Sequence, residues 1–137
     1  MKTTARNELH GKITEILSGG VMSEVKVQVS SEITISATVT NEAIASLELK
    51  TGDVVTTLIK SSFVMLSTEQ LRTTARNNFA VVISDILLGA VNSEVKLVVG
   101  EQTLCAIVTN DAVKELKLKV GQTVYAFFKA SSVLLVA

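Results

Sequence analysis

The residues of this chain that could do chemistry occur in matched pairs. Arg6 and Arg76 each lie inside a copy of the pentapeptide TTARN, and Lys60 and Lys129 each follow a run of hydrophobic residues. Arginine offers a planar fork of fixed charge, and lysine offers a compact charge. A tetrahedral dianion carries only hydrogen-bond acceptors, so a set made of donors suits it. These pairs therefore favour sites for a small oxyanion.

Hydroxyl groups accompany the arginines and lysines. They come from Thr3, Thr4, Ser61 and Ser62 and, in the second half, from Thr73, Thr74 and Ser131. The pairs Thr40-Asn41 and Thr109-Asn110 begin predicted helices, whose free N–H groups favour anions. Charge-assisted hydrogen bonds contribute about 1.5–3 kcal/mol each, so a handful of them could hold an anion at micromolar concentration. The alternative interpretation is that the arginines and lysines are solvated surface charges.

Catalytic groups are scarce by comparison. The single histidine, His10, is not repeated in the second half, and the single cysteine, Cys105, corresponds to Ser36 inside an apolar strand. We interpret His10 as a surface residue and Cys105 as a small buried thiol. The sequence has no Cys/His cluster with metal-ligand spacing and no phosphate-binding glycine loop. We therefore expect no enzyme activity, no organic cofactor and no direct cation ligands.

Two acidic residues and two glycine turns also repeat. Glu24 and Glu94 fit salt bridges at a strand edge or an interface. The turns at residues 19–23 and 89–93 have two interpretations. One is a hairpin turn whose glycines need positive φ, and the other is a nest of backbone N–H groups for a second anion.

The elements that must position these residues also occur twice. Aligning TTARN at Thr3 with TTARN at Thr73 superposes the segment SEVK at 23–26 on SEVK at 93–96. After the loss of one residue in the turn near Ser30-Ser31 and Gly100, the alignment also superposes Lys60 on Lys129. Roughly half of the aligned positions are identical, far above chance for units of this length. The sequence thus predicts a first domain at 1–66, a linker at 67–72 and a second domain at 73–137.

Each repeat is mostly strand by its pattern. Residues 25–30 and 33–39 alternate between apolar and polar side chains, and residues 54–60 are rich in β-branched types. One short helix follows Thr40-Asn41, with Ile44 and Leu47 as its apolar stripe and Gly52 beyond its end. The second repeat assigns the same roles to Thr109-Asn110, Val113, Leu116 and Gly121. The predicted fold class is all-β with a short helix per unit, as tandem OB-like Greek-key β-barrels. Such small units have exposed edges, so we expect tandem pairing and oligomerisation.

Composition narrows the class of partner. The 137 residues carry 13 basic and 13 acidic side chains, and this balance argues against binding to nucleic acid by bulk charge. Aromatic residues make up only 4% of the chain, and we expect them to pack in the core. A single cysteine and the lack of an apolar leader or membrane-spanning run indicate a soluble cytoplasmic protein without membrane partners.

With these motifs assembled, the chain resembles the molbindins of the di-Mop type, which carry two molybdenum-pterin-binding (Mop, or TOBE-like) domains in tandem. The resemblance lies in TARN at the start of each unit, GGVMSEV and GAVNSEV at the glycine turns, VTNEA and VTNDA, and KASSVLL. It implies OB-like barrels assembled as a homotrimer of tandem pairs, with molybdate or tungstate held at subunit interfaces for storage and homeostasis. The implied ligand is the oxyanion rather than a pterin.

The resemblance also implies two classes of site. An interface class would use Thr3, Arg6, Thr40, Lys60, Ser61, Thr73, Arg76, Thr109, Lys129, Ala130 through its backbone N–H, and Ser131. An axial class would use Val21, Met22, Ser23, Val91, Asn92 and Ser93. Met22 stands where the second repeat keeps Asn92, which puts the first axial site in question.

Two alternatives remain open from the sequence. An OB-fold nucleic-acid-binding module is suggested by the barrel alone, although a fold does not determine a function. A regulatory sensor whose assembly changes with the anion is the other.

Overall fold

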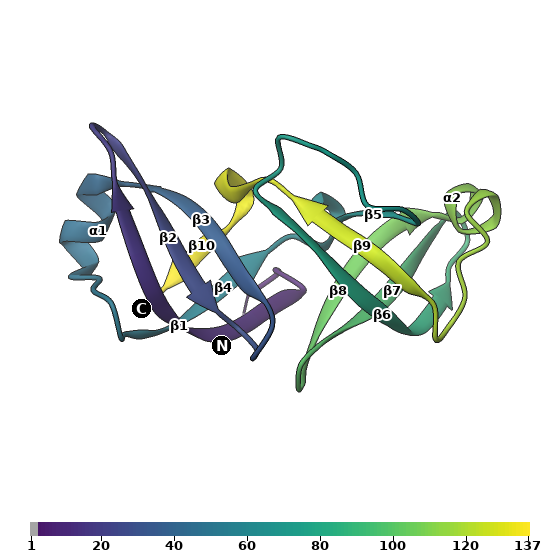
Figure 1. Cartoon of the computed structure of the whole chain (residues 1–137). Helices are drawn as coiled ribbons and strands as arrows, with labels where there is room; N and C mark the ends of the chain where they lie inside the picture. Colours follow the sequence, from purple (N-terminus) through teal and green to yellow (C-terminus); the bar gives the residue numbers. More distant parts are fainter. Residues whose placement is uncertain (1–2) are drawn as a thin grey trace.

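The computed structural model describes residues 3–137 and contains two five-stranded sheets (Figure 1). The first repeat forms β1 (Asn7–Ser18), β2 (Met22–Gln28), β3 (Thr34–Thr40), α1 (Asn41–Leu47), β4 (Val54–Ile59), the 3-10 turn η1 (Ser61–Phe63) and β5 (Met65–Ser67). The second repeat forms β6 (Asn77–Leu88), β7 (Asn92–Val99), β8 (Gln102–Thr109), α2 (Asn110–Glu115), β9 (Thr123–Phe128), the 3-10 turn η2 (Ala130–Ser132) and β10 (Leu134–Val136). The predicted fold class, mostly β with one short helix per unit in OB-like half-barrels, is confirmed.

The long first strand of each repeat curls the sheet. The beginning of β1 pairs with β4, from Asn7 opposite Ile59, and its end pairs with β2, as far as Ser18 opposite Ser23. The register shifts between Ile13 and Glu15, which is the position of a bulge that bends the strand. The strand β6 repeats this arrangement. One strand can therefore serve two neighbours that face different directions.

The sheets do not follow the sequence repeats. The first sheet has the order β10-β4-β1-β2-β3 and the second has the order β5-β9-β6-β7-β8, so each repeat gives its last strand to the other sheet. The C-terminal strand, yellow in Figure 1, lies beside β4, with Leu134 opposite Leu58, and Met65 of β5 lies opposite Phe127 of β9. The sequence did not predict this exchange. Because of it, the division of the chain at residues 66 and 73 into separate domains stays a prediction.

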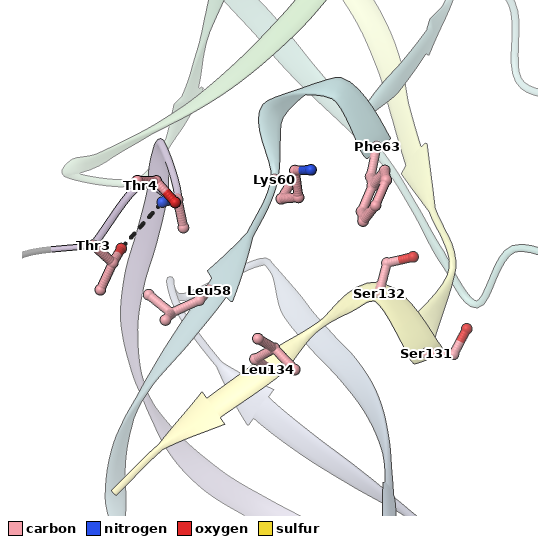
Figure 2. A pocket seen from close by; sticks show the side chains of 9 residues that line it. Thr3, Thr4, Leu58, Lys60, Phe63, Ser131, Ser132 and Leu134 are labelled. Carbon is pink, nitrogen blue, oxygen red and sulfur yellow. Dashed lines mark hydrogen bonds between the residues drawn. The ribbon is translucent and has the colours of Figure 1, made fainter.

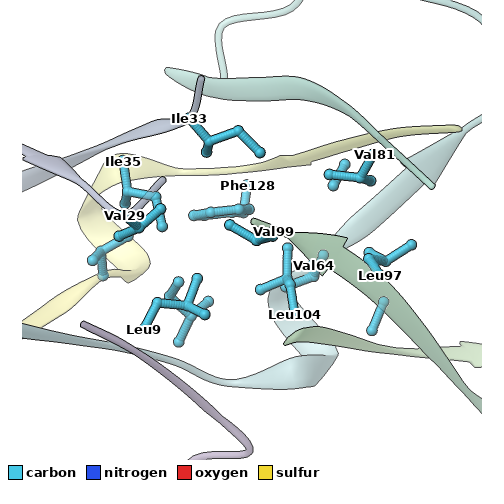
Figure 3. Packing of buried hydrophobic residues seen from close by; sticks show 14 of the residues in the cluster. Leu9, Val29, Ile33, Ile35, Val64, Val81, Leu97, Val99, Leu104 and Phe128 are labelled. Atoms are coloured by element: carbon cyan, nitrogen blue, oxygen red, sulfur yellow. The ribbon is translucent and has the colours of Figure 1, made fainter. Parts of the chain in front are cut away.

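The hydrophobic core is continuous across the two halves. Figure 3 shows Leu9 and Ile35 of the first repeat in one cluster with Leu104 and Phe128 of the second. Phe128 is fully buried and meets the edge of Phe79 at a centroid distance of 5.9 Å. The expectation that the aromatic residues pack in the core is wrong for Phe63, whose side chain is 44% exposed.

Threonine caps both helices, as predicted. The Thr40 hydroxyl oxygen accepts a hydrogen bond from the Ala43 amide at 3.1 Å, and Thr109 accepts one from Ala112 at the same distance. Each cap satisfies one of the free N–H groups at a helix start. The donor capacity of each hydroxyl stays available to another partner.

The predicted apolar stripe of the helices is partly wrong. Leu47 is 46% exposed, whereas Leu49 is 8% exposed and belongs to the core. The reason is that Glu48 adopts a left-handed conformation with φ of 53°, which ends the helix and turns the next residue inward. The second repeat does the same at Leu116, Lys117 and Leu118. Gly52 and Gly121, both at positive φ, form the next turn of each repeat.

Candidate functional site

The two TTARN segments fold in the same way. The Thr3 hydroxyl oxygen accepts a hydrogen bond from the Ala5 amide at 3.1 Å, and Thr73 accepts one from Ala75 at 3.1 Å. Both threonines are exposed. The repeated pentapeptide is therefore a local turn that presents a threonine on the surface just before a long strand.

Each arginine of the pentapeptide reaches a glutamate of the other repeat. Arg6 pairs with Glu94, and Arg76 pairs with Glu24 at 3.3 Å between Nη2 and Oε2. The glutamate side chains are only 15% and 14% exposed, whereas the arginine side chains are 55% and 66% exposed. A guanidinium has five N–H donors, so one carboxylate leaves part of the fork available to an anion. The prediction that Glu24 and Glu94 form salt bridges is confirmed.

The ion pair between Arg6 and Glu94 changes the pKa of both side chains. The hydrogen bond from Arg6 holds the pKa of Glu94 below its usual value, against the opposing effect of burial. A smaller contribution in the same direction comes from the thiol of Cys105. The same hydrogen bond and charge raise the pKa of Arg6. Glu94 is therefore a carboxylate that stays ionised beside Arg6 at neutral pH.

The asparagine that ends each TARN motif has a role that sequence reasoning missed. The side chain of Asn7 donates to the Cys105 carbonyl at 2.9 Å and accepts from the Cys105 amide at 2.6 Å, and Asn77 makes the same two bonds with Ser36. Both asparagines are buried. The amide of each asparagine side chain thus pairs with a strand backbone as a neighbouring strand would, Asn7 with β8 and Asn77 with β3. Both pairs are hydrogen bonds between the two repeats. The available signal was the repetition of an asparagine directly before a hydrophobic run.

Lys60 lies in a cavity of about 360 Å³ that both repeats build (Figure 2). Its polar lining includes Thr3 and Thr4 from the start of the chain and Ser131 and Ser132 from η2. Thr3, Lys60 and Ser131, three predicted site residues, are thereby brought together. Ser131 reaches this cavity because η2 packs against β3 after the strand exchange.

Other predicted residues lie elsewhere. Thr40 and Met22 line a neighbouring cavity of about 420 Å³, which shares Ser131 with the first, and the lining of both cavities is mostly apolar. Lys129 lines a third cavity, of about 310 Å³, with Ser62. Among residues 3–137, neither Arg6 nor Thr73 is part of the lining of these cavities, and nor are Arg76 and Thr109. Ser61 and Ala130 are buried where η1 and η2 begin.

The glycine turns are held by the asparagines that follow the helix caps. The Asn41 side chain donates to the Gly19 carbonyl at 2.9 Å and also contacts the Ser23 hydroxyl, and its backbone amide donates to Val21. Asn110 makes the same contacts in the second repeat. The axial residues therefore sit on rigid hairpin ends, with Val21 74% exposed and Val91 70% exposed.

The expectation that these turns need positive φ is wrong. Gly19 and Gly89 do not have positive φ. A Cβ on Gly19 would lie 2.4 Å from the Met22 carbonyl oxygen, and one on Gly89 would lie 2.4 Å from that of Asn92. Glycine is required here by close backbone approach rather than by backbone conformation. Whether the turns bind a second anion stays a prediction.

The remaining reactive groups are structural. Cys105 is buried as predicted, and burial, with Glu94 beside it, raises the pKa of its thiol. The His10 ring lies 2.9 Å from the Thr56 hydroxyl, and the His10 backbone is bridged to β8 by the Gln102 side chain. Within residues 3–137 no group of three or more His, Cys, Asp and Glu side chains could hold a metal ion. In the same range no helix has the length and hydropathy to cross a membrane.

Two OB-like half-barrels that exchange a strand and repeat a set of Thr, Arg and Lys donors define a class of tandem small-barrel binding proteins. The family model of the TOBE domain matches residues 3–66 and 73–135. The chain therefore belongs to the TOBE domain family, with two copies of the domain, and the predicted resemblance to tandem Mop proteins is confirmed.

Similar proteins carry molybdenum-related names. The molybdenum transport protein ModE of Azotobacter vinelandii is 44% identical over 98% of this chain, and the molybdenum-pterin-binding protein MopA of Rhodobacter capsulatus is 32% identical over 98%. The chain spans about half the length of these relatives, 51% and 52%. A crystal structure of the cytoplasmic molybdate-binding protein ModG with molybdate bound superposes with a TM-score of 0.91, at 36% identity and 98% coverage of both chains.

Proposed function

We propose that this chain is a molybdate-binding protein that stores and buffers the anion in the cytoplasm, with tungstate as a second ligand. It is a binding protein rather than an enzyme. The observation that carries the proposal is the Lys60 cavity, where Thr3, Lys60 and Ser131 gather donors from both repeats. The similarity to ModG, described as cytoplasmic and solved with molybdate bound, supports the choice of ligand because it extends over 98% of both chains.

The proposed site is completed by a second copy of the chain. Arg6 and Arg76 are exposed and keep free N–H donors, but they do not line the cavity with Lys60 among residues 3–137. We therefore assign the arginine of one subunit and the lysine of another to the same anion, in a homotrimer of tandem pairs. The proposed interface residues are Thr3, Arg6, Thr40, Lys60, Ser61, Thr73, Arg76, Thr109, Lys129, Ala130 and Ser131, and the proposed axial residues are Val21, Met22, Ser23, Val91, Asn92 and Ser93.

Calorimetric titration with molybdate and with sulfate tests this function. We expect molybdate to bind at micromolar concentration or below and sulfate to bind more weakly. Both anions are tetrahedral dianions, so the discrimination between them must come from the size of the cavity. The Arg6→Ala/Arg76→Ala variant should lose at least tenfold in molybdate affinity, since two charge-assisted hydrogen bonds contribute about 1.5–3 kcal/mol each.

The matched control is Lys12→Ala/Arg72→Ala, which removes the same charge from two exposed positions outside the proposed site. This control should bind as the wild type does. Absence of molybdate heat from the wild type, or equal loss in both double variants, would refute the proposal. Sedimentation with and without molybdate checks the trimer. The nucleic-acid alternative is not favoured, because the family relatives are molybdenum-binding by name and the net charge is +0.

A further inference from the structure

The Lys60 ammonium lies over an aromatic ring. Its Nζ is 5.3 Å from the centroid of the Phe63 ring, within the range of a cation–π contact. Figure 2 shows the lysine pointing toward the ring, which projects from η1 at the edge of the cavity. Phe63 is 44% exposed, and both Phe63 and Lys60 line this cavity.

The second repeat lacks this ring. The residue that corresponds to Phe63 is Ser132, at the third position of η2. Phe63 and Ser132 each line both the Lys60 cavity and the Lys129 cavity, so this pair lies where the two cavities meet. The two lysines that the sequence repeat makes equivalent therefore differ, because Lys60 is followed three residues later by an aromatic ring and Lys129 by Ser132.

A held ammonium should bind an anion more tightly than a free one. A lysine side chain loses rotamer entropy when it is fixed. The contact with the ring restricts the lysine rotamers before the anion binds, so binding of the anion loses less entropy. An ammonium has three N–H donors, and those that do not face the ring stay available to the anion.

We propose that Phe63 is a positioning residue that makes the Lys60 site the tighter of the two lysine sites for molybdate. The inference rests on the proposed function and deepens it. Because an exposed cation–π contact is worth about 0.5–1 kcal/mol, its loss should weaken binding at the Lys60 site about two- to fivefold.

A double-mutant cycle on molybdate affinity tests the proposal. Phe63→Leu keeps an apolar side chain but removes the ring, and Phe63→Tyr keeps the ring. We expect Phe63→Leu to weaken the tightest binding about two- to fivefold, Phe63→Tyr to stay close to the wild type, and Phe63→Leu to have no further effect when Lys60→Ala is already present.

Nuclear magnetic resonance supplies a readout that a purely structural role would not change. The ε-methylene protons of Lys60 should show an upfield ring-current shift in the wild type and in Phe63→Tyr, and lose it in Phe63→Leu. A wild type that binds molybdate with a Phe63→Leu variant of equal affinity, or an equal Phe63→Leu effect in the Lys60→Ala background, would overturn this inference alone. A wild type that binds no molybdate would overturn the proposed function as well.

Discussion

At the scale of single residues, three side chains of the pentapeptide TTARN have different structural roles. Thr3 and Thr73 form the turn, Arg6 forms an ion pair across the repeats, and Asn7 pairs with the backbone of the other repeat. A donor set that looks like a ligand site in sequence is thus also part of the fold. The two roles are compatible, because the arginine forks are only partly used.

The Arg6–Glu94 pair should make stability depend on pH. Because the folded-state pKa of Glu94 lies below the unfolded value of about 4.3, its ionised form stabilises the fold above that pH, and this contribution is lost as the pH falls through the folded pKa. We expect the wild type to exceed Glu94→Gln in free energy of unfolding at pH 7, and the difference to shrink toward pH 3. Urea unfolding across this range measures it.

The control for this experiment is Glu32→Gln, since Glu32 is an exposed glutamate. Its effect on unfolding should be small and should not change with pH. A Glu94→Gln effect that is the same at pH 7 and pH 3 would show that the ion pair does not contribute through charge.

At the scale of elements, the short helices depend on the residues just beyond their C-terminal ends. Glu48 and Lys117 adopt the left-handed conformation without being glycine, and each directs the next leucine into the core. The helical spacing of apolar residues ends at Leu47, so it cannot predict that the next buried leucine lies just beyond the helix. The core contact, rather than the helical stripe, holds the element in place.

This arrangement predicts a contrast between two leucines that are two positions apart. Leu49→Ala should lower the free energy of unfolding by about 2–5 kcal/mol, as expected for a buried leucine. Leu47→Ala should change it by no more than about 0.5 kcal/mol, because Leu47 is largely exposed. Urea unfolding at one protein concentration compares them. A larger loss for Leu47→Ala than for Leu49→Ala would contradict the described helix end.

At the scale of the whole molecule, the two repeats share their sheets and their core. Each sheet takes an edge strand from the other repeat, the core is continuous, and Asn7 and Asn77 add hydrogen bonds across the boundary. The exchange also carries η2 to the Lys60 cavity, so the proposed site exists only in the paired structure.

We therefore expect the two repeats to stay associated after the linker is cut. A protease site introduced within residues 67–72 allows cleavage of the folded protein. The fragments should elute together on size exclusion and unfold in a single transition, because each completes the sheet of the other. Fragments that separate in native buffer and remain folded would show that the strand exchange is not needed for stability.

Much of this architecture could be predicted from the sequence. Alternation identified the strands, and Thr40 and Thr109 identified the caps. Of the predicted site residues, Thr3, Lys60 and Ser131 line one cavity, whereas Thr73, the counterpart of Thr3, does not line the cavity of Lys129. The glycine turns were located correctly, although the reason for glycine was not. Partners distant in sequence, such as Glu94 for Arg6 and Cys105 for Asn7, could not be assigned.

Two similar units of short strands with a repeated set of donors can be predicted from local properties of the chain, namely periodicity, helix caps and repetition. The strand that completes each sheet, and therefore the donors that share a cavity, are visible only in the folded chain. The two repeats are so similar in sequence that the pattern of residues does not distinguish β5 from β10 as the partner of β4 or β9. In the folded chain β10 pairs with β4 and β5 pairs with β9, and the two repeats share one core.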